Sequence, residues 1–575
     1  MARMNRMLGL GLLVGLAVLA QSCGDDDGAG PNGVTLEFTL TDIDLQAGRD
    51  TVMQVRNTGT VATGPVEFVP LAVRDTAGTM VSGPSLAVVP TQLLSLNPGA
   101  TASVALSITT PPGTPNGDYR VNLEARTPAS GLLATTLLRF SVTSGTGSPT
   151  NTDVMITGGP TAFVRGDVVQ FIAEVTDSAG AVIPGATVQW SVLGFGLFDV
   201  DGQFVAYSTG QISVVARSGS SADTLAVTVS DRTLTGSFTV VGPGGGATAS
   251  AGRTSDLWVN GNVLYSGTHS GGNGAFHAWS IATPTNPVLM DSIFIDASIV
   301  NDVKIRDDGT LAVITHEGSS DGLNGVTLLD MTDPNHPTVI TRYTQGLEAG
   351  VHNAWIDGND LYLVTDGASP STGGLRILNI TNPSSPTQIG SFYGGSSSLH
   401  DVYVRGGLAF LSHWRAGVII LDVGDGRAGG SPSNPVEIGR LLIPNIPIHN
   451  IWYWPSSGYA FIGDEITSPG TMYVVDVSDM TVPRQVATFA LAGATPHNFW
   501  LDETRGILYA AWYGRGIRAI DVNGQLMGEL ERQGREIAGF EYDGSSTNAW
   551  APQLHNGLIY LTDFGSGVWV LQPNF

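Results

Sequence analysis

One short phrase recurs seven times between residues 233 and 575, and this repeat constrains the fold more than any other feature. The phrase is an Asp or Asn, one further residue and usually an aromatic residue. Its copies begin 46 to 51 residues apart, at Asp256, Asp302, Asn353, Asp401, Asn450, Asn498 and Asn548. Repeats of about this length are typical of β-propellers, in which each unit forms one four-stranded antiparallel sheet.

Each unit contains signals for four short strands, as the third unit illustrates. The phrase at Asn353 is followed by an apolar run at Leu361–Thr365, a Gly-rich turn and another run at Leu375–Asn379. An Asn-Pro-x-x-Pro turn then leads to a fourth strand at Gln388–Phe392. Short β-rich runs between Gly and Pro turns, without helical periodicity after residue 25, predict an all-β chain.

The seventh unit ends after its third strand, so its sheet lacks one strand. The segment Thr235–Val241, just before the first unit, has the pattern of a strand that belongs to no unit. We expect it to complete the seventh sheet, because closing the ring removes the exposed sheet edges that favour aggregation. The sequence therefore predicts a seven-bladed β-propeller over residues 233–575.

The third strands carry a second recurring phrase, which begins with Gly and ends with Asp or Asn. It occurs at Gly325–Asp330, Gly374–Asn379 and Gly417–Asp422, and together with the Asn-Pro-x-x-Pro turns it resembles the LVIVD repeat family. The His-Asn pairs at His449 and His497 are similar to the choice-of-anchor B branch of that family. The resemblance covers residues 235–575 and implies a propeller fold. It implies no particular activity, because the family has no established common function.

Two smaller β-rich segments precede the repeats, at residues 34–143 and 153–231. In the first, strand patterns occur at Val34–Leu40, Asp50–Arg56, Thr101–Thr109, Gly117–Ala125 and Leu133–Val142. In the second, Asp177–Trp190 is similar to bacterial Ig-like repeats, and we expect Trp190 to fill the core between two sheets. Strands and turns at this spacing predict two Ig-like β-sandwiches, joined by a polar linker at residues 144–152.

The N-terminus has the features of an export signal. Arg3 and Arg6 precede an apolar run of 13 residues, Leu8–Ala20, which is too short to cross a bilayer and fits a signal peptide. Residues Leu19–Cys23 resemble a bacterial lipobox, which implies removal of residues 1–22 and lipidation of Cys23. The alternative is an ordinary secretory signal with an unpaired thiol. Cys23 is the only cysteine, so no intrachain disulfide forms.

Residues 23–33 are rich in Gly and Asp, which is typical of a flexible tether. The acidic run Asp25–Asp27 resembles the surface-export signals of some Gram-negative lipoproteins. We therefore expect an exported protein, anchored in the cell envelope by its N-terminal lipid, with the outer membrane as its location and surface display as an open alternative.

The formal net charge of −24 excludes one large class of partner. An acidic chain without a basic stripe is repelled by phosphate backbones, so we expect no nucleic-acid binding. The partners that remain are the membrane, through the lipid, and a protein or polysaccharide of the envelope or of the extracellular space.

All ten histidines lie in the repeat region, and four of them directly precede the repeated Asp or Asn. They are His352, His400, His449 and His497, in four consecutive units. The repeated phrase lies on the innermost strand, so we expect these imidazoles at one level around the central channel. The antiparallel second strands end near the same level, with His269, His316, Glu317, Asp366, His413, Asp464, Glu465, Tyr513 and Asp563.

This arrangement predicts a transition-metal site at one mouth of the channel, because imidazole and carboxylate groups are ligands for such ions. The predicted ligands are His352, His400, His449 and His497, with support from His316, Asp366, His413, Asp464 and Glu465. An equally weighted alternative is that the four histidines form hydrogen bonds to neighbouring blades. We expect the repeated Asp and Asn to accept backbone amide hydrogen bonds in turns.

The repeated tryptophans are predicted to pack between blades. They are Trp258, Trp355, Trp452, Trp500 and Trp550.

Three functions remain, because the chain has no nucleophile elbow, phosphate-binding loop, HExxH sequence or dinucleotide fingerprint. The first is a binding protein that displays the propeller to a ligand, a polymer or a protein. The second is a metal-dependent oxidoreductase or hydrolase that uses the four histidines, which requires an open coordination position in a reachable pocket. The third is a structural adhesin, which requires an exposed apolar or aromatic patch.

Overall fold

The computed structural model describes residues 36–575 except for several short stretches. These are residues 39–42, 47–49, 64–65, 77–78, 82–83, 90–91, 94–95, 111–113, 116, 128–130, 143–152, 200, 220, 243–252, 270–273, 368, 370–372, 396–397, 415, 444–445, 466–468 and 543–546. The predicted signal peptide, Cys23, the tether and the 144–152 linker lie outside the described residues. In the described part strands dominate, and no helix is long and apolar enough to cross a membrane.

Contacts divide the chain into two units, Met1–Ser148 and Pro149–Phe575. Among its described residues the first unit contains two sheets. One has the order β1 (Leu36–Phe38), β3 (Asp50–Asn57), β8 (Thr101–Thr109) and β6 (Ser85–Val89). The other has the order β2 (Ile43–Gln46), β10 (Gly131–Val142), β9 (Gly117–Thr127), β4 (Val66–Pro70) and β7 (Gln92–Leu93), and β5 (Arg74–Asp75) also pairs with β9.

Strand β9 shows why these residues form a sheet over a core. Tyr119, Val121, Leu123 and Ala125 are buried, and the residues between them are more exposed. This period of two is that of a strand with one covered face. The five strands predicted in this segment are confirmed, with ends shifted by a few residues, whereas the shorter β2, β4, β5, β6 and β7 were not predicted.

Residues 153–231 belong to the second unit and form three small sheets among the described residues. Their orders are β11 (Asp153–Gly158) and β14 (Ile172–Thr176); β12 (Ala162–Val164), β19 (Ser221–Ser230), β18 (Gly210–Ser218) and β15 (Gln189–Leu193); and β13 (Val168–Gln170), β17 (Gln203–Ala206) and β16 (Gly196–Phe198). Trp190 is buried and stacks on Phe198, with ring centroids 5.6 Å apart. The predicted core position of Trp190 is confirmed.

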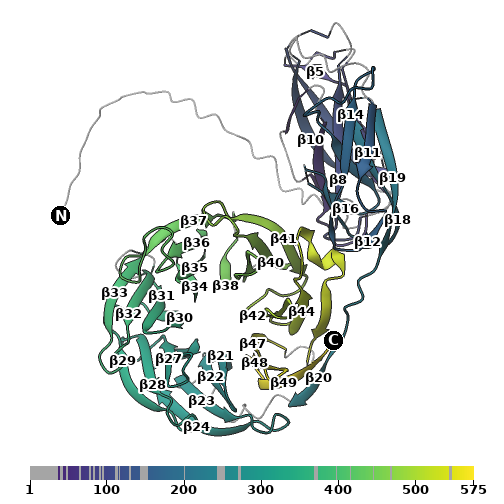
Figure 1. Ribbon diagram of the computed structural model, residues 1–575. Helices are drawn as coiled ribbons and strands as arrows, with labels where there is room; N and C mark the ends of the chain where they lie inside the picture. Colours follow the sequence, from purple (N-terminus) through teal and green to yellow (C-terminus); the bar gives the residue numbers. More distant parts are fainter. Residues whose placement is uncertain are drawn as a thin grey trace, which may run out of the picture. The chain divides into compact units, whose positions relative to one another are not determined.

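The rest of the second unit is a β-propeller, and Figure 1 shows its sheets side by side around a central axis. From the axis outward, the sheets of the first three repeats are β21 (Arg253–Asn260), β22 (Val263–His269), β23 (Gly274–Ser280) and β24 (Val288–Ile295); β26 (Val303–Ile305), β27 (Leu311–His316), β28 (Gly325–Asp330) and β29 (Thr338–Tyr343); and β30 (Val351–Asp357), β31 (Asp360–Asp366), β32 (Gly373–Asn379) and β33 (Thr387–Phe392). In the first sheet, β25 (Ile299–Val300) also pairs with β22.

The next three repeats form sheets of the same kind. They are β34 (Leu399–Arg405), β35 (Leu408–His413), β36 (Gly417–Asp422) and β37 (Val436–Leu441); β38 (Ile448–Trp454), β39 (Tyr459–Asp464), β40 (Gly470–Asp476) and β41 (Arg484–Leu491), with β45 (Gly528–Glu529) beside β41; and β42 (Phe499–Asp502), β43 (Ile507–Ala511), β44 (Ile517–Asp521) and β46 (Glu536–Phe540). A 3₁₀ helix, η2 (Leu530–Gln533), precedes β46.

The last sheet joins the two ends of the repeat region. It consists of β47 (Ala549–His555), β48 (Leu558–Asp563), β49 (Gly567–Asn574) and β20 (Ser237–Gly242). Strand β20 pairs antiparallel with β49, with Ser237 opposite Asn574 and Val240 opposite Leu571. The predicted pairing of the segment before the first repeat with the last repeat is confirmed.

The middle strands of the sheets are continuous apolar runs because both of their faces are covered. Strands β27 and β36 are buried at every described position, whereas the rim strand β29 is partly exposed throughout. Neighbouring sheets pack face to face, and one buried cluster joins Phe410 and Ile420 of one sheet to Ile451 and Ile462 of the next. This packing orients the first strand of every sheet toward the axis.

Arg535 connects the propeller to the sheets formed by residues 153–231. Its side chain is 1% exposed, and it donates to the Gly166 carbonyl oxygen at 2.6 Å. Further acceptors are the side chain of Gln533 and the carbonyl oxygens of Asp521, Asn523 and Gln525. The guanidinium group therefore uses its five donors without reaching water.

Candidate functional site

Three of the four predicted histidines lie at irregularities in the first strands of their sheets, and His497 lies just before the first strand of its sheet, β42. In β30, β34 and β38 the strand register shifts around His352, His400 and His449, so each is the extra residue of a β-bulge. A bulge re-aims one side chain without ending the strand. These histidines, with His497, line one narrow space on the axis together with repeated Asp and Asn residues.

In the seventh repeat the equivalent bulge residue is Trp550. His352 and Trp550 both lie five residues before the last pair of the hairpin that joins the first two strands, at Asp357 and His555. The assignment of Asn548 to the repeated position was therefore wrong by three residues. The Asn556-Gly557 turn marks this hairpin in the sequence, and counting back from it identifies the register.

The imidazoles form one continuous row. Ring centroids are 4.5 Å apart for His352 and His400, 4.6 Å for His400 and His449, and 4.2 Å for His449 and His497. The row ends on Trp550, whose ring centroid is 4.1 Å from that of His497.

Two of the histidines form the predicted hydrogen bonds to the neighbouring sheet, but these bonds use only one ring nitrogen. His400 Nδ1 donates to the His449 carbonyl oxygen at 3.1 Å, and His497 Nδ1 donates to the Trp550 carbonyl oxygen at 2.7 Å. A carbonyl acceptor fixes the proton on Nδ1 and leaves a lone pair on Nε2, which is how proteins prepare imidazole for a metal. The two hypotheses for these residues are therefore compatible.

Glu465 lies beside this row. Its Oε2 atom is 3.8 Å from His400 Nε2, and its Oε1 atom accepts a 2.6 Å hydrogen bond from the Tyr513 hydroxyl. One donor atom from each of His400, His449 and Glu465 lies within 4.8 Å of the others. Ligand atoms that lie about 2.0–2.2 Å from one zinc ion are closer to one another than 4.8 Å. Small rotations of the three side chains would therefore bring their ligand atoms to a common ion.

Tyr513 orients Glu465 from an unusual backbone conformation. Its φ angle is +31°, which a bulky side chain rarely adopts. Such conformations cost roughly 1–3 kcal/mol and cluster at functional sites, where neighbouring structure maintains them. Here the backbone of Tyr513 forms a bridge to Ala549 at the start of the next sheet.

A second group of possible ligands contains Glu317, His352 and Asp366. His352 Nδ1 lies 2.8 Å from Glu317 Oε1. Burial lowers the pKa of His352, but its hydrogen bond to Glu317 and the charges of Glu317, Asp366 and Glu465 outweigh burial and raise that pKa to about 9. Burial and Glu317 raise the pKa of Asp366 to about 7. His352 is therefore a cation paired with Glu317 at neutral pH.

The other three imidazoles are neutral. Burial and the neighbouring histidines lower the pKa values of His400 and His497 well below the usual range. Burial also lowers the pKa of His449. Only a neutral imidazole has the lone pair that a metal needs, so the group formed by His400, His449 and Glu465 fits a metal ion better than the group around His352.

The structure does not bring the remaining predicted residues into either group. His316, His413 and Asp464 are buried at the ends of their strands, and His269 packs against Trp550 and Phe564. Asp563 accepts a hydrogen bond from the Tyr542 hydroxyl. Among the described residues, only the two groups above bring three or more potential ligand atoms within 4.8 Å of one another.

Two of the repeated Asp residues accept backbone amide hydrogen bonds, as predicted, but the amides belong to the residue that follows each Asp and to the next sheet, and not to a turn. Asp302 Oδ2 accepts from the Ala354 amide at 2.8 Å, and Asp401 Oδ2 accepts from the Ile451 amide at 3.3 Å. Burial raises the pKa of Asp401 to about 6.

Lys304 lies among these carboxylates, and sequence reasoning gave it no role. Its Nζ atom is 2.8 Å from Asp256 Oδ2 and also contacts Asp302. Burial raises the pKa of Asp256 to about 7, although the charge of Lys304 opposes the shift. The sequence did contain a sign of a special role for this residue, because Lys304 is the only lysine and occupies the aromatic position of the repeated phrase.

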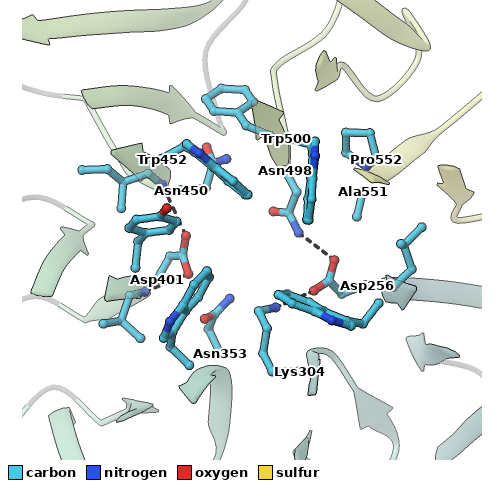
Figure 2. Close-up of a pocket in the computed structure, with 17 residues that line it drawn as sticks. Asp256, Lys304, Asn353, Asp401, Asn450, Trp452, Asn498, Trp500, Ala551 and Pro552 are labelled. Atoms are coloured by element: carbon cyan, nitrogen blue, oxygen red, sulfur yellow. Dashed lines mark hydrogen bonds and ion pairs between the residues drawn. The ribbon is translucent and has the colours of Figure 1, made fainter. Parts of the chain in front are cut away.

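Beyond the carboxylates, the axis opens into a cavity of about 60 Å³ (Figure 2). Trp258, Trp355, Trp452 and Trp500 line it, so these tryptophans face the channel as well as their neighbouring sheets. Trp550 alone lies at the histidine end.

Comparison with known proteins identifies the repeats. Residues 352–393 and 396–442 match the LVIVD repeat, and no curated protein matches the sequence. The crystal structure of the computationally designed Ika8 protein aligns with 11% identity and a TM-score of 0.41, over 58% of this chain and 99% of that chain. The β-propeller domain of Cps50 (Swd1) from Myceliophteria thermophila aligns with 11% identity and a TM-score of 0.43, over the same shares of the two chains.

Proposed function

We propose that this LVIVD-repeat β-propeller protein is an exported, lipid-anchored binding protein of the cell envelope, whose channel binds a divalent transition-metal ion through His400, His449 and Glu465. Two Ig-like β-sandwiches precede its seven-bladed propeller. The fixed Nδ1 proton of His400 carries the proposal, because it leaves Nε2 as a ligand 3.8 Å from Glu465.

The chemistry of the three ligands supports a zinc or ferrous ion. Two histidines and one carboxylate hold zinc in several hydrolases and Fe(II) in many oxygenases. Tyr513 holds the other oxygen of Glu465, as outer hydrogen bonds hold metal ligands elsewhere.

Metal analysis of the full chain tests this site. The protein, purified in detergent and stripped with a chelator, is reloaded with zinc, copper, iron or nickel, and its metal content is measured by mass spectrometry. We expect one ion per chain in the parent, and its loss in His400→Ala and His449→Ala. The exposed His336 provides the matched control, because His336→Ala should bind like the parent. A folded parent that binds none of the four metals would exclude the site.

A metal-dependent enzyme is the second candidate, because the described residues supply three protein ligands to this group and a three-ligand site leaves a coordination position open. Cobalt substitution distinguishes it from a closed metal site. Azide should shift the visible spectrum of the cobalt protein if an exchangeable position exists, and an unchanged spectrum would argue against catalysis at the ion.

The envelope location depends on Cys23, which is the sole cysteine and follows the predicted signal peptide. Intact-mass analysis of the membrane fraction should find a chain that begins at residue 23 and carries acyl groups. The variant Cys23→Ser should lose the lipid mass and appear in the soluble fraction. A wild-type chain released without lipid would exclude the anchor.

A further inference from the structure

The part of the channel beyond the histidines and carboxylates is enclosed by aromatic side chains from several sheets. Ring centroids are 6.3 Å apart for Trp258 and Trp355, 4.6 Å for Trp355 and Tyr403, and 5.2 Å for Tyr403 and Trp452. Trp500 closes the ring, 5.1 Å from Trp452 and 6.1 Å from Trp258. The five aromatics thus surround the cavity of about 60 Å³.

The base of this cavity has more negative than positive groups. Asp256 and Asp401 line the cavity together with Lys304, the one basic residue among the described residues that line it, and Asp302 contacts Lys304. Figure 2 shows Asp256, Asp401 and Lys304 pointing toward a common centre. Buried carboxylates whose negative charge is not fully balanced by nearby positive charge favour the binding of a second cation. In addition, Asn353 Oδ1 is buried and accepts no hydrogen bond from the residues that the structure describes.

The ammonium group of Lys304 shows that the aromatic walls of this cavity bind a cation. Its ammonium group lies 5.6 Å from the centroid of the Trp258 ring while it contacts Asp256. The negative face of an aromatic ring attracts such a cation, most strongly for tryptophan and away from water. Lys304 lies beside one member of the ring, and Trp355, Tyr403, Trp452 and Trp500 also line the cavity.

We propose that this aromatic ring, with the carboxylates at its base, binds a small organic ammonium ion. The cavity volume sets the size of the ligand. A cavity of about 150 Å³ binds benzene, so one of about 60 Å³ admits an ion of only a few heavy atoms, such as methylammonium. A neutral ligand leaves the carboxylates uncompensated. A hard metal cation finds too few oxygen ligands among the indole rings.

Calorimetry with methylammonium tests the proposal, and methanol serves as a neutral probe of similar size. The full chain in detergent should bind methylammonium at least tenfold more tightly than methanol. The variants Trp452→Leu and Asp401→Asn should each weaken methylammonium binding about tenfold, and Trp452→Phe should restore part of it. Trp569→Leu is the matched control, because Trp569 lies on β49, the third strand from the axis, and does not line the cavity.

The outcomes separate this site from the metal site. The double variant His400→Ala/His449→Ala should bind methylammonium like the parent, so a missing metal ion leaves this inference intact. Equal affinity for methylammonium and methanol, or no binding of either by the folded parent, would overturn it. Binding that persists unchanged in both folded Trp452→Leu and Asp401→Asn would overturn it as well.

Discussion

Neighbouring histidines in one row have different charge states because their surroundings differ. At His352 the Glu317 hydrogen bond and the nearby carboxylates outweigh burial and hold the ring as a cation, whereas at His400 burial and the adjacent histidines keep the ring neutral. Only a neutral ring leaves a nitrogen lone pair for a metal. The carbonyl that faces Nδ1 of His400 then fixes the proton on that nitrogen and leaves the lone pair on Nε2.

Removing the Tyr513 hydroxyl should weaken metal binding without removing a ligand. Tyr513→Phe frees Glu465 Oε1, and loss of such an outer hydrogen bond typically costs about 10–100-fold in metal affinity. Competition with a chromophoric chelator measures the affinity of the full chain. Tyr343→Phe, on the rim strand β29, is the control and should bind like the parent. An unchanged affinity in Tyr513→Phe would mean that Glu465 is not a ligand.

At the scale of the strand, periodicity and turns were sufficient to predict most elements. The middle strands have continuous apolar runs because both faces are covered, and the Gly and Pro turns mark their ends. The bulges were not recognised, because a strand that is buried on both faces shows no alternation for an inserted residue to interrupt. Asn548 was assigned to the wrong register because the repeated phrase was matched to Trp550 and was not counted back from the Asn556-Gly557 turn. The tautomer of His400 depends on the His449 carbonyl of the next sheet, which only the structure reveals.

The turn into the third strand of each sheet requires glycine, and Gly417 provides a test. Its φ is +83°, and a Cβ there would overlap the Leu441 carbonyl oxygen. Gly426 has a φ of +90° but no atom within 4 Å of such a Cβ. We expect Gly426→Ala to cost about 1–3 kcal/mol from backbone strain alone, and Gly417→Ala to cost more. Urea unfolding followed by fluorescence measures both variants. Equal midpoints for the two would show that the β37 backbone moves aside.

At the scale of the second unit, one buried arginine joins the β-sheets of residues 153–231 to the propeller by donating hydrogen bonds to both. Arg535 donates to the Gly166 carbonyl oxygen on one side and to the Asp521 and Asn523 carbonyl oxygens on the other. Arg232 adds ion pairs to Asp167 and Asp521 across the same contact. The buried guanidinium group of Arg535 and the partly exposed ion pairs of Arg232 therefore hold the two parts together.

Arg535→Leu should uncouple the two parts. Several buried carbonyl oxygens lose their donor, at about 1–3 kcal/mol for each one that stays unsatisfied. Differential scanning calorimetry of the full chain should show a lower transition temperature and a separate transition for residues 153–231. The exposed Arg484 provides the control, since Arg484→Leu removes only a surface ion pair with Asp476. A variant that melts like the parent would show that the contact contributes no stability.

The pairing of β20 with β49 has a consequence for biosynthesis. Ser237 leaves the ribosome long before its partner Asn574, so the first strand of the ring waits unpaired while every other sheet is made. Bringing such distant segments together is entropically costly, and contacts of this range fold slowly. The propeller is thus complete only after β49 has been made, and a chain truncated before β49 leaves two open edges, at β20 and at β48, available to other chains.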